Sequence, residues 1–273
     1  MNFLFRERRH LAVLLHHFPL EHSPARCRCS QRWNVIAPCA GFFILLLTAS
    51  GAIAATTNEL SDAEIRGRQL AQQLCELQPT VNFTNQGVLQ IRHGDGKHTG
   101  VSVRFQTIVT TTNWRVIYET TDETNQVRLV VIHSGGQPNR YQFLKNDLNE
   151  NEIMAPFAGS DFWIADLGLQ FFHWPQQKIL KHEMRRGRSC QVLESTNPDP
   201  SPNGYSRVVS WIDNETLGIV QAEAYDAKGQ LLKEFYPKTF KKVSGQWELQ
   251  EMEIRNDQTG SRTRLEFDLK QKD

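Results

Sequence analysis

The sequence lacks the short motifs by which common enzyme classes are recognised. It contains no G-x-S-x-G nucleophile turn, no phosphate-binding loop, no dinucleotide-binding fingerprint and no paired C-x-x-C. His182-Glu183 resembles the start of the zinc-protease motif H-E-x-x-H, but Arg186 occupies the position of the second histidine. We therefore predict a protein that is not an enzyme and needs neither a cofactor nor a metal. A hydrolase with an unrecognised site is the alternative.

Net charge is also low, and few cysteines lie beyond the N-terminal part. The 31 basic and 30 acidic residues leave a formal net charge of +1, which gives no electrostatic reason to expect a nucleic-acid partner. Of the five cysteines, only Cys75 and Cys190 follow residue 54. In an oxidising compartment these two could form one disulfide; otherwise they are two free thiols.

One long apolar run is present near the N-terminus. Residues 35–55 carry no charge, follow several arginines, and end in the small-residue pattern Ala52-Ile53-Ala54. This pattern predicts a secretory signal peptide over residues 1–54 with a long basic n-region. The run is also close to the roughly 20 residues that span a bilayer, so an uncleaved inner-membrane anchor is the alternative. We expect export to the periplasm.

Removing residues 1–54 from the 273-residue chain leaves 219, enough for one domain with a sizeable core over residues 55–273. This domain is predicted to begin with a helix. The segment Leu60–Glu64 supplies an N-cap, and apolar residues recur at helical spacing from Ile65 to Leu77.

The rest of the domain has the pattern of an antiparallel β-sheet. Short runs rich in Val, Ile, Thr and aromatic residues alternate with Gly, Asn, Asp and Pro, as at the turn Gly94-Asp95-Gly96. Eleven strands in one domain imply a strongly curved sheet or an open barrel, so the predicted class is mainly β, with some α. The strands are expected near residues 87–93, 99–109, 113–120, 126–133, 139–144, 189–196, 205–213, 216–226, 230–241, 246–256 and 261–269.

Residues 145–188 are predicted to be irregular and contain the aromatic centre of the domain. A curved sheet with an uncovered concave face needs apolar side chains to line it, so these aromatics suit a hydrophobic cavity. For any single residue, ordinary core packing is the simpler interpretation. The candidate cavity residues are Phe105, Trp114, Tyr118, Leu129, Phe143, Phe162, Trp163, Phe171, Phe172 and Trp174.

Two polar groups could also form sites. His93, Asp95 and His98 flank a hairpin turn where they could meet around a metal, but a turn with exposed polar neighbours explains them more simply. A basic cluster could attract anionic head groups or the acidic face of a partner, although a solvated surface is the simpler interpretation. It comprises Lys178, Lys181, His182, Arg185, Arg186 and Arg188.

The second half of the sequence resembles the outer-membrane lipoprotein-sorting protein family, the LolA-like group. The resemblance covers residues 155–267, whereas the earlier strands match only in pattern. It is carried by five runs that recur in order: Gly159–Gly168, Gly187–Ser195, Tyr205–Asp213, Tyr225–Lys233 and Met252–Gly260.

The resemblance implies an unclosed antiparallel barrel of the LolA/LolB type, with an N-terminal helix and a short helical cover. It also implies that an apolar cavity receives lipoprotein acyl chains or lipid in the periplasm, for transfer to the outer membrane, without a cofactor. Membrane-bound donor and acceptor proteins are the implied partners, and we expect a monomer. The alternative is a non-catalytic envelope scaffold whose concave sheet face binds a protein or a cell-wall component.

Overall fold

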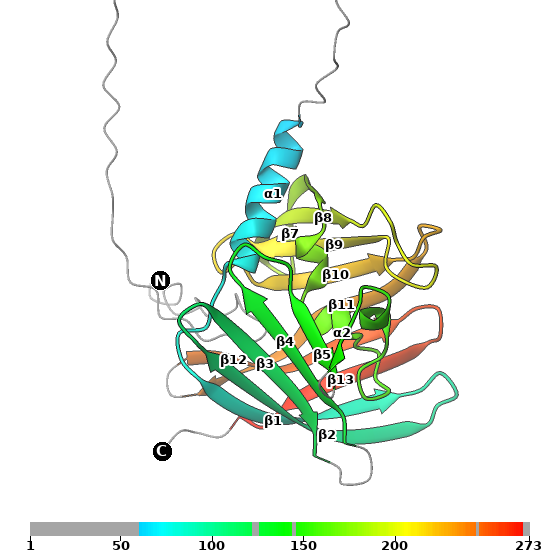
Figure 1. Ribbon diagram of the computed structural model, residues 1–273. Coiled ribbons are helices and arrows are strands. Elements are labelled where there is room, and N and C mark those ends of the chain that lie inside the picture. Colours follow the sequence, from blue (N-terminus) through cyan, green and yellow to red (C-terminus); the bar gives the residue numbers. More distant parts are fainter. Residues whose placement is uncertain (1–59, 122–125, 144–145, 244–245, 270–273) are drawn as a thin grey trace, which may run out of the picture. The chain divides into compact units, whose positions relative to one another are not determined.

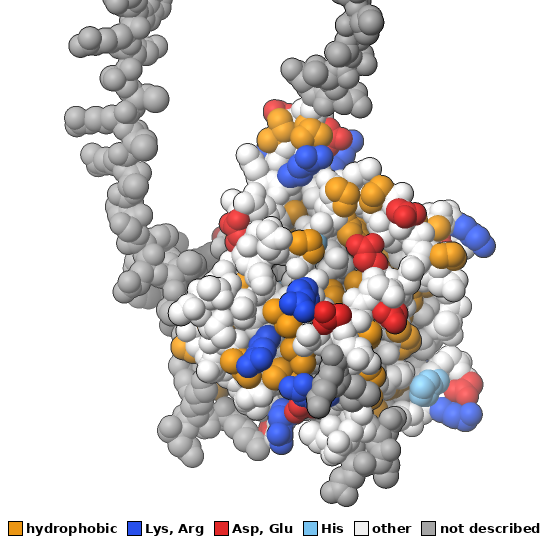
Figure 2. All heavy atoms as spheres, in the orientation of Figure 1, with side chains coloured by type: hydrophobic (Ala, Val, Ile, Leu, Met, Phe, Trp, Pro, Cys, Tyr) orange, Lys and Arg blue, Asp and Glu red, His pale blue; other side chains and the backbone are white. Residues whose placement is uncertain are grey.

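The computed structural model describes residues 60–121, 126–143, 146–243 and 246–269 (Figure 1). The predicted signal peptide, residues 1–54, lies outside these ranges. Among the described residues, no helix has both the length and the apolar character needed to cross a bilayer. Charges of both signs occur on the face seen in Figure 2, interspersed with hydrophobic side chains.

The first element is the helix α1, Asp62–Cys75, as predicted. Ser61 is its N-cap, and the Ser61 and Glu64 side chains each bond to the other's backbone N–H in a capping box. Leu70 and Ala71 face inward and pack beside the strand β7, Gln176–Arg185. The apolar stripe of α1 therefore covers one end of the sheet (Figure 1).

The thirteen strands of the described residues belong to one antiparallel sheet, in the order β6-β5-β4-β3-β2-β1-β13-β12-β11-β10-β9-β8-β7. The two end strands, β6 and β7, do not pair with each other, so the sheet is not closed into a barrel. Besides β7, the strands are β1 Phe83–Arg92, β2 His98–Val109, β3 Asn113–Thr120, β4 Arg128–Ser134, β5 Arg140–Phe143, β6 Asn146–Asp147, β8 Arg188–Thr196, β9 Arg207–Asp213, β10 Ile219–Tyr225, β11 Leu231–Val243, β12 Gln246–Asn256 and β13 Ser261–Phe267.

The eleven predicted strands are all present, but the prediction of irregular structure for residues 145–188 is wrong at both ends of that segment. Asn146–Asp147 pairs briefly with β5, and β7 is a full strand paired with β8. Strand β7 has a weak sequence signal because it lies at the sheet edge. Its Leu180 is 43% exposed and its Met184 is 66% exposed, so hydrophobic and polar residues do not alternate as in a half-buried strand.

The segment between β6 and β7, residues 148–175, lies over one face of the sheet, and we call it the cover. It contains the 3₁₀ turn η1 (Glu152–Met154), the short helix α2 (Ile164–Leu167) and the 3₁₀ turn η2 (Gln170–His173). We call the sheet face beneath it the inner face. Buried residues of the inner face and of the cover together form the two larger hydrophobic clusters. A smaller cluster around Trp211 lies on the outer face.

Candidate functional site

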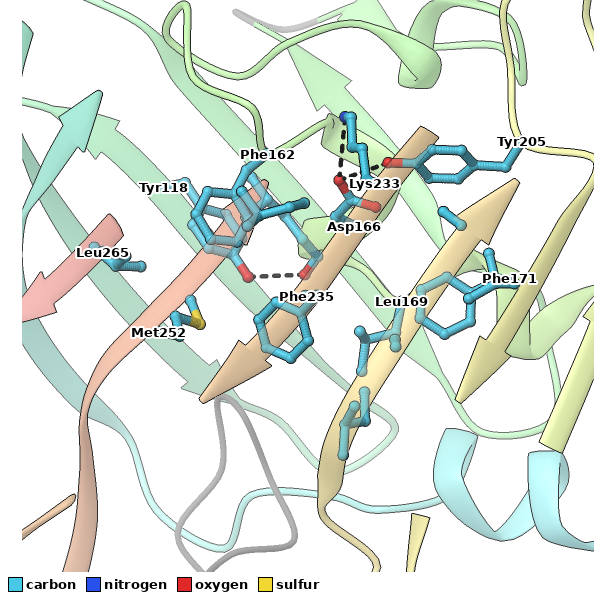
Figure 3. Close-up of a pocket in the computed structure, with 16 residues that line it drawn as sticks. Tyr118, Phe162, Asp166, Leu169, Phe171, Tyr205, Lys233, Phe235, Met252 and Leu265 are labelled. Carbon is cyan, nitrogen blue, oxygen red and sulfur yellow. Dashed lines mark hydrogen bonds and ion pairs between the residues drawn. The ribbon is translucent and has the colours of Figure 1, made fainter. Parts of the chain in front are cut away.

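A cavity lies between the inner face of the sheet and the cover (Figure 3). The cavity has a volume of about 60 Å³ and is partly open to solvent. Such a space admits a few waters but not a long ligand, unless the cover moves. The sheet wall comes mainly from β9 to β13, with Tyr118 contributed by β3.

The cavity walls are almost entirely apolar. Because β-strand side chains alternate between faces, Ala222 and Ala224 of β10 both point inward, and their small size leaves room beneath the cover. The other apolar wall residues are Phe162, Leu167, Leu169, Phe171, Val208, Ile219, Phe235, Met252, Ile254 and Leu265.

Local hydrogen bonds fix the shape of the cover around α2. Trp163 is the N-cap of α2, and its backbone N–H donates to Asp166 Oδ2 at 2.8 Å. Leu169 adopts a left-handed conformation with φ 50°, which ends α2 and turns the chain into η2. The hydroxyl of Tyr118 donates to the carbonyl of Leu167 at 2.9 Å and ties the cover to β3.

The cover also packs very closely on β5. The side-chain amide of Asn139 donates to the carbonyl of Gly168 at 2.6 Å, and the Tyr141 hydroxyl bonds to Gln170 at 3.0 Å. A Cβ atom at Gly168 would lie 2.2 Å from the Tyr141 hydroxyl, so only glycine fits this approach.

One polar group interrupts the apolar cavity. Lys233 of β11 is 1% exposed, and its Nζ donates to the backbone carbonyl of Asp161 at 2.7 Å. The same Nζ lies 3.8 Å from Asp166 Oδ2 and 3.6 Å from the centre of the Trp163 ring. Tyr205 donates to Asp166 Oδ2 at 3.1 Å and stacks on Trp163. We call Lys233, Asp166 and Tyr205 the polar centre.

Burial shifts the protonation of all three members. Loss of hydration lowers the pKa of Lys233 from 10.5 to about 7, although the nearby Asp166 and Asp161 oppose this shift. Burial raises the pKa of Asp166, while Lys233 and the hydrogen bonds from Trp163 and Tyr205 act in the other direction. Burial also raises the pKa of Tyr205 well above its usual value. Among the three, Lys233 is the member whose pKa lies near neutral pH.

The structure brings three of the ten predicted cavity residues to the cavity: Tyr118, Phe162 and Phe171. Phe105, Trp114 and Leu129 are buried in the core and do not line it. Phe143 is half-buried on β5, and Trp163 touches the polar centre from the side. Phe172 and Trp174 instead face a second hollow beside α1.

Of the two states that the sequence leaves open for Cys75 and Cys190, the structure has the two free thiols. Cys75 of α1 belongs to the inner-face cluster, whereas Cys190 of β8 belongs to the outer-face cluster, so the sheet separates them. Burial also raises the pKa of Cys75 to about 12, which makes its thiol a poor nucleophile.

The polar residues of the hairpin turn and those of the basic cluster, which the sequence singled out, have local roles. In the hairpin between β1 and β2, Asp95 bonds to Lys97, while His93 bonds to Thr99. Among the described residues, no group of three or more His, Cys, Asp or Glu side chains is arranged to hold a metal. In the basic cluster, Arg188 pairs with Asp213 and Arg185 lies over the Trp211 ring.

Sequence analysis missed all three members of the polar centre. Asp166 and Tyr205 do lie within the runs that carry the family resemblance, and Lys233 is the last residue of one such run. One signal was available in the sequence. Lys233 occupies an inward position of its strand, and inward positions of an antiparallel sheet are normally apolar.

Comparison with known proteins supports the fold. A crystal structure of a DUF1329 family protein from Desulfovibrio piger matches with a TM-score of 0.62 and 20% identity, over 76% of this chain and 92% of that one. A putative outer membrane lipoprotein-sorting protein domain from Vibrio parahaemolyticus matches with a TM-score of 0.62 and 19% identity, over 75% and 91%. A LolA superfamily protein from Nitrosomonas europaea matches with a TM-score of 0.51 and 17% identity, over 78% and 95%.

At these identities the three structures show the fold and not the function. No curated protein matches the sequence. A family model described as "Uncharacterized protein" matches residues 113–272, which is more than half of the chain and includes the cover and the cavity. The chain therefore belongs to the family that this model describes, and its fold is LolA-like.

Proposed function

We propose that this protein is a periplasmic carrier that binds lipoprotein acyl chains or lipid in the cavity beneath the cover, for transfer to the outer membrane. The observation that supports this function best is the apolar cavity between an unclosed sheet and a separate covering segment. The names of two structural neighbours, which refer to lipoprotein sorting and to LolA, agree with the proposal.

The energetics suit reversible binding. Each buried methylene contributes about 0.8 kcal/mol, so a chain of roughly 16 carbons provides on the order of 10 kcal/mol if it is fully enclosed. The cavity without a ligand is too small for such a chain, so binding requires the cover to move away from the sheet. The cost of that movement reduces the net affinity and allows the cargo to be released.

A cavity-filling substitution tests the carrier function. Ala224→Phe places a ring in the cavity, whereas Ala227→Phe places the same ring in an exposed turn and serves as the control. We expect the purified wild-type protein and the control to contain lipid detectable by mass spectrometry and to bind a fluorescent fatty acid. We expect Ala224→Phe to lose both. A wild-type protein without lipid and without probe binding contradicts the proposal.

The second candidate is an envelope scaffold that binds a protein or a cell-wall component. Packing favours this alternative in part, because the predicted cavity residues Phe105 and Trp114 are buried in the core and do not line the cavity. A scaffold would keep its partner binding in the Ala224→Phe variant, whereas a carrier would lose its cargo. The same variant therefore separates the two functions.

A further inference from the structure

The cavity has a single cation among its described lining residues, and that cation is Lys233. Figure 3 shows Lys233, Asp166 and Tyr205 grouped together, away from Met252 and Leu265. The cavity thus has a polar end and an apolar remainder. A molecule with one acidic head and one hydrocarbon chain has the same division.

Lys233 retains unused hydrogen-bonding capacity. A protonated lysine has three N–H donors, but the described residues offer Nζ one hydrogen bond, to the carbonyl of Asp161. Asp166 Oδ2 is 3.8 Å away, beyond hydrogen-bond distance, and the Trp163 ring accepts only a weaker cation–π contact. A protonated Lys233 therefore has two N–H donors that make no hydrogen bond to the described residues.

The carboxylates beside Lys233 also have other hydrogen-bond partners. The carboxylate of Asp161 is already satisfied by the hydroxyls of Ser261 and Thr263. Asp166 likewise accepts hydrogen bonds from Tyr205 and from the backbone of Trp163. Lys233 is therefore not the only partner of these carboxylates, although its removal alone would leave buried Asp166 without its cation.

We propose that Lys233 binds the carboxylate of a fatty acid whose hydrocarbon chain lies along the apolar wall of the cavity. This assignment rests on the proposed carrier function and narrows its cargo to single-chain amphiphiles with an acidic head. The ammonium donates charge-assisted hydrogen bonds to the carboxylate, and the chain extends toward Met252 and Leu265.

Charge balance makes binding depend on pH. The groups that face Lys233 are Asp161 and Asp166 of the cover and Tyr205, which precedes β9. A bound carboxylate adds a negative charge beside Asp166. Two neighbouring carboxylates repel each other when both are ionised, so one of them holds a proton more tightly. Burial also lowers the pKa of Lys233 to about 7, so the ammonium form that would bind the carboxylate is favoured at lower pH. We therefore infer that Lys233 and Asp166 together take up a proton when the ligand binds and that affinity increases as the pH falls from about 8 to about 6.

Competition between ligands of equal chain length tests the head-group assignment. Dodecanoic acid and 1-dodecanol are titrated against a fluorescent fatty acid bound to the full chain. We expect the acid to displace the probe about tenfold better than the alcohol, as one charge-assisted hydrogen bond implies. In Lys233→Met this preference disappears, whereas the exposed-site control Lys228→Met retains it.

A second variant decides the question even if Lys233→Met does not fold. Asp166→Asn removes the competing charge but keeps an acceptor for Tyr205, so we expect tighter dodecanoic acid binding near pH 6, where protonated Lys233 is favoured. Equal displacement by acid and alcohol in the wild type overturns the head-group assignment and leaves the carrier function intact. Displacement by neither ligand, with no probe binding, overturns the carrier function itself.

Discussion

The Nζ atom of Lys233 lies 3.6 Å from the centre of the Trp163 ring, so a buried cation on the sheet touches the residue that caps α2 in the cover. The same Nζ also bonds to the Asp161 carbonyl just before that residue. The polar centre is thus a junction between sheet and cover as well as a feature of the cavity. Its protonation bears on both stability and binding.

Lys233→Met is expected to change how stability depends on pH. Between about pH 7 and about pH 10 the unfolded chain keeps a proton on Lys233 that the folded protein has released, so the free energy of unfolding increases with pH. The slope approaches about 1.4 kcal/mol per pH unit for one proton, and Lys233→Met lacks this contribution. Urea unfolding at several pH values from about 7.5 to about 9 measures the difference. Parallel curves for the two proteins would show that the lysine is not perturbed.

Tyr118→Phe is expected to loosen the cover. The substitution removes the hydroxyl that bonds to the Leu167 carbonyl and leaves that buried carbonyl without this donor, which costs about 1–3 kcal/mol. Amide hydrogen exchange over residues 157–173 should become faster, and urea should unfold the variant at a lower concentration. Tyr225→Phe removes a hydroxyl from the outer face instead and should leave exchange in the cover unchanged. Unchanged hydrogen exchange in both variants would show that the bond between Tyr118 and the Leu167 carbonyl does not hold the cover in place.

Gly67→Ala is expected to separate α1 from the sheet. A Cβ at this position would lie 2.5 Å from the backbone nitrogen of Lys178, so α1 must shift away from β7. Alanine improves helix propensity by about 1 kcal/mol, but the steric cost of about 1–3 kcal/mol is larger. Chemical denaturation should show lower stability than in Gln73→Ala, which changes an exposed position of the same helix. A Gly67→Ala protein more stable than this control would disprove the close contact.

Glu253→Gln is expected to weaken the acid dependence of stability. Glu253 lies on the outer face of β12, where burial alone would raise its pKa, but hydrogen bonds from Tyr236, Arg255 and Arg264 lower it to about 2. The folded carboxylate therefore contributes stability above about pH 4.5 that is lost as the pH falls toward about 2. Acid titrations followed by circular dichroism should show a flatter profile in the variant. Glu150→Gln, at an exposed position, should titrate like the wild type.

The sheet was predictable from the sequence because its signals are local. Strand β2 alternates inward Val103 and Phe105 with polar neighbours, and the turn after β1 contains Gly96 at φ 86°. The helix α1 was equally clear, since the Ser61 cap and the apolar stripe lie within a few turns of each other. Edge strand β7 was missed because few of its residues face the core.

The site was less predictable because it depends on contacts between distant residues. Aromatic content indicated a cavity, yet Trp114 and Phe105 fill the core while the alanines of β10 create the space. Small residues give no signal of this kind in a single sequence. Likewise, Lys233 meets Asp166 only because β11 passes beneath the cover, a relationship that no local pattern encodes.

The strand order has a consequence for how the chain folds. Every neighbouring pair in the sheet is consecutive in the sequence except β1 and β13, where Arg92 pairs with Arg262. The strands β1 to β6, and the strands β7 to β13, can therefore each pair through short-range contacts. Pairing β1 with β13 requires the closure of one very long loop. We expect the pairing of β1 with β13 to form last and to limit the folding rate.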